Sequence, residues 1–304
     1  MKKIKNLAAS VFFVVLAIVI ITNCSDKEKD DLYLKGIESW RENRINSLKK
    51  PDSWLSLTGL YWLKEGENKF GSDKSNEIIF PEKAPKFVGS IFLSDSVVTI
   101  KIIDGIQVLN EGKPVAEMVL VNDMSAKPTV LTHGSLSWHI IKRAGNKHGI
   151  RLKDSQSELL KNFGGIETFP TNKDWKLEAR FTPYDPPKKI IVPNVIGIAE
   201  EEGSPGKLSF KIGSEEFTLD VLNGGEKYFI VFADKTNGEE TYGAGRFLTV
   251  EKPDSTGKTY IDFNKAYNPP CAFTKYATCP LPPRQNMLKV SIEAGEKIYG
   301  EGHN

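Results

Sequence analysis

Polar side chains able to bind or transform a small molecule are concentrated between residues 239 and 268. The candidates among them are one arginine, three of the carboxylates, two amides and one of the phenols: Arg246, Glu239, Glu240, Asp262, Asn264, Asn268 and Tyr267. An arginine can hold a carboxylate or phosphate through two parallel hydrogen bonds, or it can form a buried pair with a nearby acid. Arg246 and the four polar residues from Asp262 to Asn268 are therefore candidate ligand-binding residues. In the second case Arg246 would pair with Asp262 and hold the chain in place.

The three carboxylates allow a catalytic alternative. Glycoside hydrolases use two carboxyl groups about 5 to 10 Å apart across a cleft. Glu239, Glu240 and Asp262 are the candidates for such a pair. The sequence does not fix their separation, so a hydrolase acting on envelope or glycan material stays an alternative to a ligand-binding protein.

The first 24 residues predict export from the cytoplasm. Lys2, Lys3 and Lys5 precede fifteen apolar or small residues at 7–21, and a strongly polar stretch follows Cys24. This arrangement resembles a bacterial lipoprotein signal, which implies removal of residues 1–23 and acylation of Cys24. An uncleaved anchor or an ordinary signal peptide is the alternative. We expect an extracytoplasmic protein attached to a bacterial membrane, on its periplasmic or surface side.

Residues 262–283 predict an ordered but irregular loop. Five prolines between positions 269 and 283 remove backbone donors and exclude a regular helix or a central strand. Ordering such a loop costs about 1 to 2 kcal/mol per residue in backbone entropy, so something must hold it. A disulfide between Cys271 and Cys279 is the expected restraint in an oxidising compartment. Metal ligation, a reactive thiol pair and two reduced, buried cysteines are the alternatives.

The rest of the chain predicts a mainly β fold. One helix is expected over 32–49, ended by Pro51. Beyond it, short runs of Val, Ile, Phe, Tyr and Trp alternate with turn residues, as in antiparallel sheets. We expect an acylated tether and helix at 24–50, followed by two packed β-sandwich or barrel-like modules at 51–155 and 156–304. Tight hairpin turns are expected at 143–146 and 212–215.

Composition excludes several classes of function. The chain has 41 Lys plus Arg against 39 Asp plus Glu, and this balance gives no basic surface for nucleic acid. Its histidines lack the paired spacing of metal ligands. Gly243 and Gly245 have no third glycine after them and no strand-to-helix context, so they do not form a dinucleotide-binding motif. No metal and no cofactor is expected.

Two resemblances to known families add to these expectations. Residues 71–80 resemble the loop and strand of forkhead-associated domains, which are β-sandwiches that bind phosphothreonine. The arginine and the Ser-x-x-His segment that would hold the phosphate are missing. The resemblance therefore implies at most a similar fold for the first module.

The second resemblance covers nearly all of the mature chain. It rests on TYGAGRFL at 241–248, DFNKAYNPPCAFTKYATCPLPP at 262–283, the PDSWLSLTGLYWLKEGENKFGSD segment at 51–73 and AGEK near the end. These segments are similar to the bacterial and archaeal proteins grouped as domain of unknown function 1684. The resemblance implies a β-rich protein, often a lipoprotein, and assigns no activity. The favoured function is a lipid-anchored envelope protein that binds a small or anionic ligand near Arg246 and the 262–283 loop, and a non-catalytic partner-binding module is a further alternative.

Overall fold

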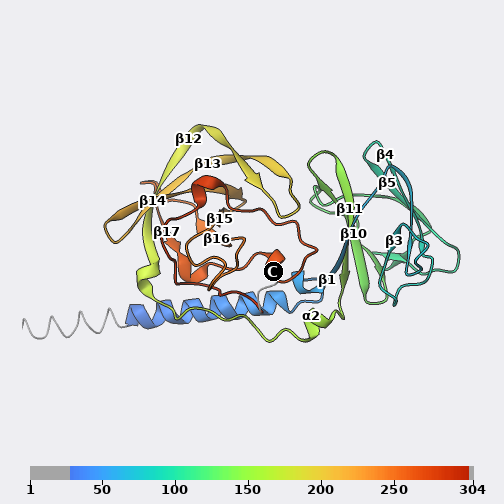
Figure 1. Cartoon of the computed structure of the whole chain (residues 1–304), viewed down its shortest axis with the longest axis horizontal. Coiled ribbons are helices and arrows are strands. Elements are labelled where there is room, and N and C mark those ends of the chain that lie inside the picture. The colour runs from blue at the N-terminus through green and yellow to red at the C-terminus, as the bar shows by residue number, and fades with distance from the viewer. Residues whose placement is uncertain (1–27, 301–304) are drawn as a thin grey trace, which may run out of the picture. The chain divides into compact units, whose positions relative to one another are not determined.

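A computed structural model describes residues 28–300 of the chain (Figure 1). The predicted signal peptide and Cys24 lie outside the described residues. A helix occupies residues 28–48, close to the range that the sequence predicts. No helix within 28–300 is both long and apolar enough to cross a membrane. The chain forms two compact units, with the border between Arg44 and Ile45.

Residues 57–154 form two sheets. Within each sheet, hydrogen-bonded neighbours are antiparallel except for the pair β2 and β3. The first sheet has the order β1 (Leu57–Trp62), β11 (Lys147–Asp154), β10 (Leu136–Arg143), β9 (Leu131–His133), β6 (Leu109–Asn110), β7 (Lys113–Pro114). The second has the order β3 (Ile78–Ile79), β2 (Gly66–Gly71), β4 (Gly89–Ser94), β5 (Val97–Ile102), β8 (Glu117–Leu120).

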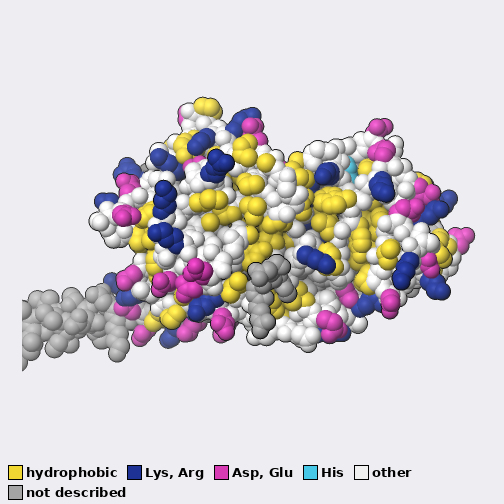
Figure 2. All heavy atoms as spheres, viewed as in Figure 1, with side chains coloured by type: hydrophobic (Ala, Val, Ile, Leu, Met, Phe, Trp, Pro, Cys, Tyr) yellow, Lys and Arg dark blue, Asp and Glu magenta, His cyan; other side chains and the backbone are white. Residues whose placement is uncertain are grey.

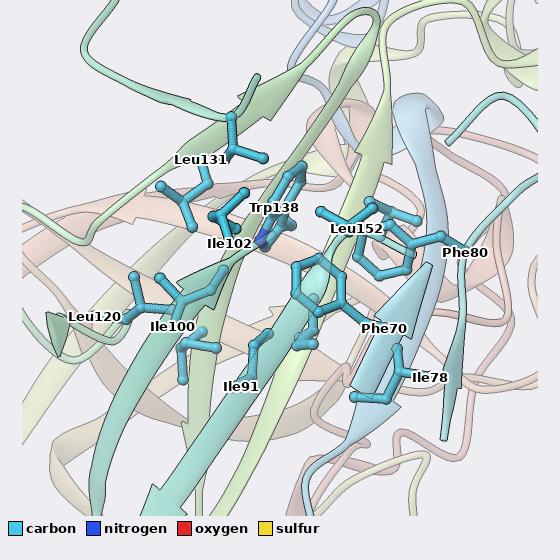
Figure 3. Close-up of a cluster of buried hydrophobic side chains, with 14 of the residues drawn as sticks. Phe70, Ile78, Phe80, Ile91, Ile100, Ile102, Leu120, Leu131, Trp138 and Leu152 are labelled. Atoms are coloured by element: carbon cyan, nitrogen blue, oxygen red, sulfur yellow. The ribbon is translucent and has the colours of Figure 1, made fainter. Parts of the chain in front are cut away.

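The core of these two sheets surrounds Trp138 (Figure 3). Trp138 is 1% exposed, and its ring meets those of Phe70 and Phe80 edge-on, with centroids 6.0 and 5.5 Å away. Buried and more exposed residues alternate along β4 and β5, because successive side chains on a strand point to opposite faces. The same alternation in β10 places His139 on the face opposite Trp138.

Residues 176–262 form a third sheet, which is six-stranded and antiparallel throughout. Its order is β16 (Arg246–Glu251), β15 (Lys227–Phe232), β14 (Glu215–Gly224), β13 (Ala199–Ile212), β12 (Lys176–Pro193), β17 (Lys258–Asp262). The edge strands β16 and β17 contact each other, so the sheet is nearly closed into a barrel. The predicted hairpin at 212–215 is present, with Ile212 paired to Glu215 and Gly213 at a φ of +60°. The mainly β fold class is confirmed.

Residues 287–292 form no strand, and Met287 makes an isolated bridge to Ala233. The backbone N–H of Ile292 donates to a carboxylate oxygen of Asp234, and the Ile292 carbonyl accepts from Arg246. The side chains of Asp234 and Arg246 thus satisfy the backbone of Ile292, whereas Leu288 donates to the Ala233 carbonyl and the Val290 carbonyl accepts from Lys235.

Charged side chains of both signs are interspersed on the face that Figure 2 shows, with apolar side chains between them. This mixture agrees with the balanced composition. No single-sign field dominates the visible face.

Candidate functional site

The predicted site residues after β17 hold the start of the 262–283 loop. Asp262 caps the short 3-10 helix η3 (Phe263–Lys265) by accepting from the backbone N–H of Asn264 at 3.2 Å. The Asn264 side chain is buried and spans the backbone of Asn172: it accepts from the Asn172 N–H at 3.0 Å and donates to the Asn172 carbonyl at 2.8 Å. These two residues tie the loop to the segment before β12.

Asn268 and Tyr267 join the loop to other parts of the chain. The backbone N–H of Asn268 donates to the Glu296 carboxylate at 2.6 Å, and its side-chain amide donates to the Lys297 carbonyl at 2.7 Å. The backbone of Tyr267 pairs with that of Phe247 in β16, and the two rings meet edge-on with centroids 5.8 Å apart. The amides and the phenol thus belong to the framework of the loop.

Arg246 is fully buried at the start of β16 and forms an ion pair with Asp234. The Arg246 Nη2 to Asp234 Oδ2 distance is 2.7 Å, and both side chains are 0% exposed. The same guanidinium donates to the carbonyls of Ile292 and Ala294, at 3.0 and 2.5 Å. The second oxygen of Asp234 accepts from the Ile292 N–H and from the backbone and hydroxyl of Thr236.

This geometry corrects the predicted partner of Arg246, which is Asp234 and not Asp262. Burial lowers the pKa of the Arg246 guanidinium, and the neighbouring Asp234 carboxylate opposes that effect. Buried charges are tolerated where they are paired and hydrogen-bonded. Arg246 therefore fastens the 292–294 segment to the β16 end of the barrel.

Gly245, directly before Arg246, is required by the packing of the loop. Its φ is +90°, and a Cβ at this position would collide with the ring of Pro282 and the carbonyl oxygen of Phe232. Only glycine adopts such a conformation without strain. The TYGAGRFL and Pro-rich segments are therefore packed against each other.

The three candidate catalytic carboxylates do not form a cleft. Glu239 and Glu240 are exposed in the turn after Asp234, whereas Asp262 is half-buried and caps η3. None of the three lines the cavities described below. The geometry gives no support to a pair of carboxylates acting on a glycan.

Cys271 and Cys279 are free thiols in the structure, so the predicted disulfide is not formed. The backbone N–H of Cys271, in η4 (Pro270–Ala272), donates to the Cys279 sulfur at 3.1 Å. Packing holds the loop instead of a bridge. Ala277 and Cys279 share an apolar cluster with Leu57, Val231 and Phe247.

The middle of the loop forms one wall of a cavity of about 700 Å³. Its lining is mainly apolar and aromatic, with a thiol, two phenols, a hydroxyl and an ammonium group. The lining residues are Leu57, Leu159, Val195, Ile196, Tyr242, Cys271, Phe273, Thr274, Lys275, Tyr276 and Ala277. Tyr242 donates from its hydroxyl to the Cys271 carbonyl at 3.1 Å, and burial raises the pKa of that hydroxyl.

Next to this cavity, two arginines of the first module contact the loop. Arg143 in β10 and Arg151 in β11 both donate to the hydroxyl of Thr278, at 3.3 and 3.0 Å. Arg143 also forms an ion pair with Asp123 at 2.9 Å. Burial, followed by the charge of Arg143, lowers the pKa of Arg151 to about 10. These contacts anchor the loop on the side opposite Arg246.

A second cavity, of about 320 Å³, has Arg143 and Thr278 on its wall together with Glu200 and Glu202. Its volume is at the lower limit of small-molecule sites, which span roughly 300 to 1,000 Å³. The carboxylates of Glu200 and Glu202 would repel an anionic ligand. The larger cavity beside Cys271 is therefore the better candidate site.

The cavity borders the loop in which the sequence predicted the site, but none of the residues predicted to bind a ligand lines it. The prediction missed Tyr242 and Lys275 on the cavity wall, although both lie within segments that carried the family resemblance. It also missed Val195 and Ile196, which lie between β12 and β13. Two adjacent apolar residues directly before Gly197 were the available signal.

Comparisons with known proteins give a family and no activity. No curated protein matches the chain. An uncharacterised protein of Haloarcula marismortui, solved in solution by NMR, is 31% identical over 46% of this chain and 80% of that chain, with a TM-score of 0.39. Residues 161–297 match the family model described as protein of unknown function (DUF1684). That match includes the barrel, the loop and the Arg246 pair but not the similar segment at 51–73, and the chain belongs to the DUF1684 family.

Proposed function

We propose that this chain is a lipid-anchored protein of the cell envelope that binds a small, largely apolar molecule carrying an anionic or polar group. The cavity of about 700 Å³ beside the 262–283 loop carries this proposal. Its volume falls within the usual range of sites for small ligands. The loop that forms its wall is fixed through Asn264, Asn268 and Thr278, so the site is formed before a ligand arrives.

The chemistry of the wall indicates the class of ligand. Leu57, Val195 and Ile196 offer apolar surface, and Tyr242 offers an aromatic ring whose hydroxyl donates to the Cys271 carbonyl. Lys275 is the one charged residue among the described residues that line this cavity. An apolar body would lie against the aliphatic and aromatic groups, while an anionic group would face the Lys275 ammonium.

Anchoring is supported by the sequence of the first 24 residues. Two or more acyl chains on Cys24 would hold the protein on a membrane without a spanning helix. Full-length protein should partition into the detergent phase of Triton X-114, and C24A protein should stay in the aqueous phase. Equal partitioning of the two would remove the anchoring part of the proposal.

Ligand binding is tested with 8-anilinonaphthalene-1-sulfonate, a probe that combines apolar rings with one anionic group. Val195 is 38% exposed, so V195W should fill the cavity without disturbing the core and should abolish saturable fluorescence. K275A should weaken binding about fivefold, because a partly exposed charge contributes about 1 kcal/mol. Native mass spectrometry of the purified protein would identify any ligand that co-purifies.

Two matched variants serve as controls for this titration. V119W places the same side chain at an exposed valine of β8, and K235A removes an exposed lysine that is not part of the cavity wall. Both should bind the probe as the unmodified protein does. Unchanged affinity in V195W and K275A would contradict the proposed site and favour a non-catalytic partner-binding module.

A further inference from the structure

Two thiols lie together at the cavity that we assign to ligand binding. Cys271 is half-buried and lines the cavity, whereas Cys279 is 5% exposed and lies behind it. Their contact is documented by the 3.1 Å hydrogen bond from the Cys271 N–H to the Cys279 sulfur. Cys271 is thus the thiol that an incoming molecule meets.

The surroundings of Cys271 favour its ionised form. The contact with the Cys279 thiol lowers the pKa of Cys271, although burial opposes this effect, and the Tyr242 hydroxyl, which donates to the Cys271 carbonyl, also lowers it. The same contact with Cys271, together with burial, raises the pKa of Cys279. Since the thiolate is the nucleophilic form of cysteine, the arrangement separates a nucleophile from a proton donor.

We propose that Cys271 forms covalent adducts with apolar α,β-unsaturated carbonyl compounds that enter this cavity. The inference rests on the proposed function, because the cavity must first admit the molecule. Conjugate addition requires a soft nucleophile and a nearby proton donor, and the thiol pair supplies both. The aliphatic and aromatic wall suits the uncharged carbon skeleton of such a compound.

The step balances without an oxidant or a reductant. A sulfur lone pair of the Cys271 thiolate forms the new C–S bond at the β-carbon, and the π electrons of the C=C bond move to the carbonyl oxygen. The resulting enolate takes the Cys279 thiol proton at its α-carbon. Cys279 then regains a proton from solvent.

N-ethylmaleimide is the probe, with intact mass and peptide mapping as readouts on the folded protein at pH 7. We expect one adduct, on the peptide containing Cys271, formed faster than on glutathione, since a lowered thiol pKa raises the thiolate fraction at the working pH. C279A and Y242F should slow labelling, because each removes a hydrogen bond to Cys271. T249V, on the exposed side of β16, should react as the unmodified protein does.

The rate at which N-ethylmaleimide labels Cys271 in the unmodified protein tests the proposal even if a variant does not fold. Labelling of Cys271 no faster than glutathione, or faster labelling at Cys279, would overturn the proposal. If 8-anilinonaphthalene-1-sulfonate binds the cavity in that case, the proposed function stands and the nucleophile alone is refuted. If the probe also fails to bind, both are refuted.

Discussion

Arg246 and Asp234 form an ion pair from which solvent is wholly excluded, with 2.7 Å between Nη2 and Oδ2. The pair lies at the β16 end of the barrel and reaches the backbone of residues 292–294 through three hydrogen bonds. Because neither charge can reach water, each depends on the other. The framework that supports the cavity wall depends on this one contact more than on any exposed ion pair.

Breaking the pair should be strongly destabilising. We expect D234N to lower the free energy of unfolding by about 3 to 5 kcal/mol, since it leaves the arginine buried without its counter-ion. Urea unfolding followed by tryptophan fluorescence measures this loss. E178Q makes the same chemical change in the Lys258–Glu178 pair, whose side chains are 40% and 64% exposed, and it should cost less than about 1 kcal/mol. Equal costs in the two variants would contradict the assigned role of Asp234.

A methyl group at Gly245 should detach the loop. G245A forces a Cβ against Pro282 and Phe232 at a φ of +90°, so we expect a loss of at least about 1 kcal/mol and faster proteolysis within 262–283. G243A is the matched control, because its nearest neighbour would be Gly238 at 3.6 Å. Similar protease resistance in both variants would show that the loop does not depend on this contact.

His139 should make stability depend on pH. Burial, together with the charges of Arg151, Lys153 and Arg143, lowers the pKa of His139 to about 4, against 6.5 when exposed. Between pH 4 and 6.5 the unfolded chain therefore binds a proton at His139 that the folded chain does not bind. Its stabilising contribution is complete above pH 6.5 and is lost as the pH falls toward 4, by up to about 3 kcal/mol.

The variant H139Q should flatten this dependence. Between pH 4 and 6.5 the free energy of unfolding of H139Q should change less than that of the unmodified protein. The difference should equal the contribution of one bound proton. H133Q, in β9, should retain the original slope because it leaves His139 in place. An unchanged slope in H139Q would show that the imidazole titrates alike in both states.

The alternation of side chains made the fold class predictable. Trp138 and His139 are adjacent in sequence and lie on opposite faces of β10, as a period of two requires. The local sequence likewise predicted the turn at Gly213. Side-chain alternation and turn preferences predicted these features because each depends on residues that are close together in the sequence.

The partners of buried polar groups were not predictable in the same way. Asp234 is 12 residues from Arg246, and the carbonyls that complete the site are 46 and 48 residues away. Asp262, an acid in the expected loop that is farther from Arg246 along the chain, was predicted instead. Only the barrel topology selects between them, and one sequence does not determine topology at that level. The same limit hid the contact of Thr278 with Arg151, 127 residues apart.

The acceptors of Arg246 also set a condition on biosynthesis. Ile292 and Ala294 lie 46 and 48 residues after Arg246 in the chain, so they are synthesised after the whole of β16. Until they arrive, the β16 terminus has a guanidinium with most of its hydrogen-bonding positions unfilled. A growing polypeptide therefore cannot complete the hydrogen bonds of this guanidinium before the 292–294 segment has been made.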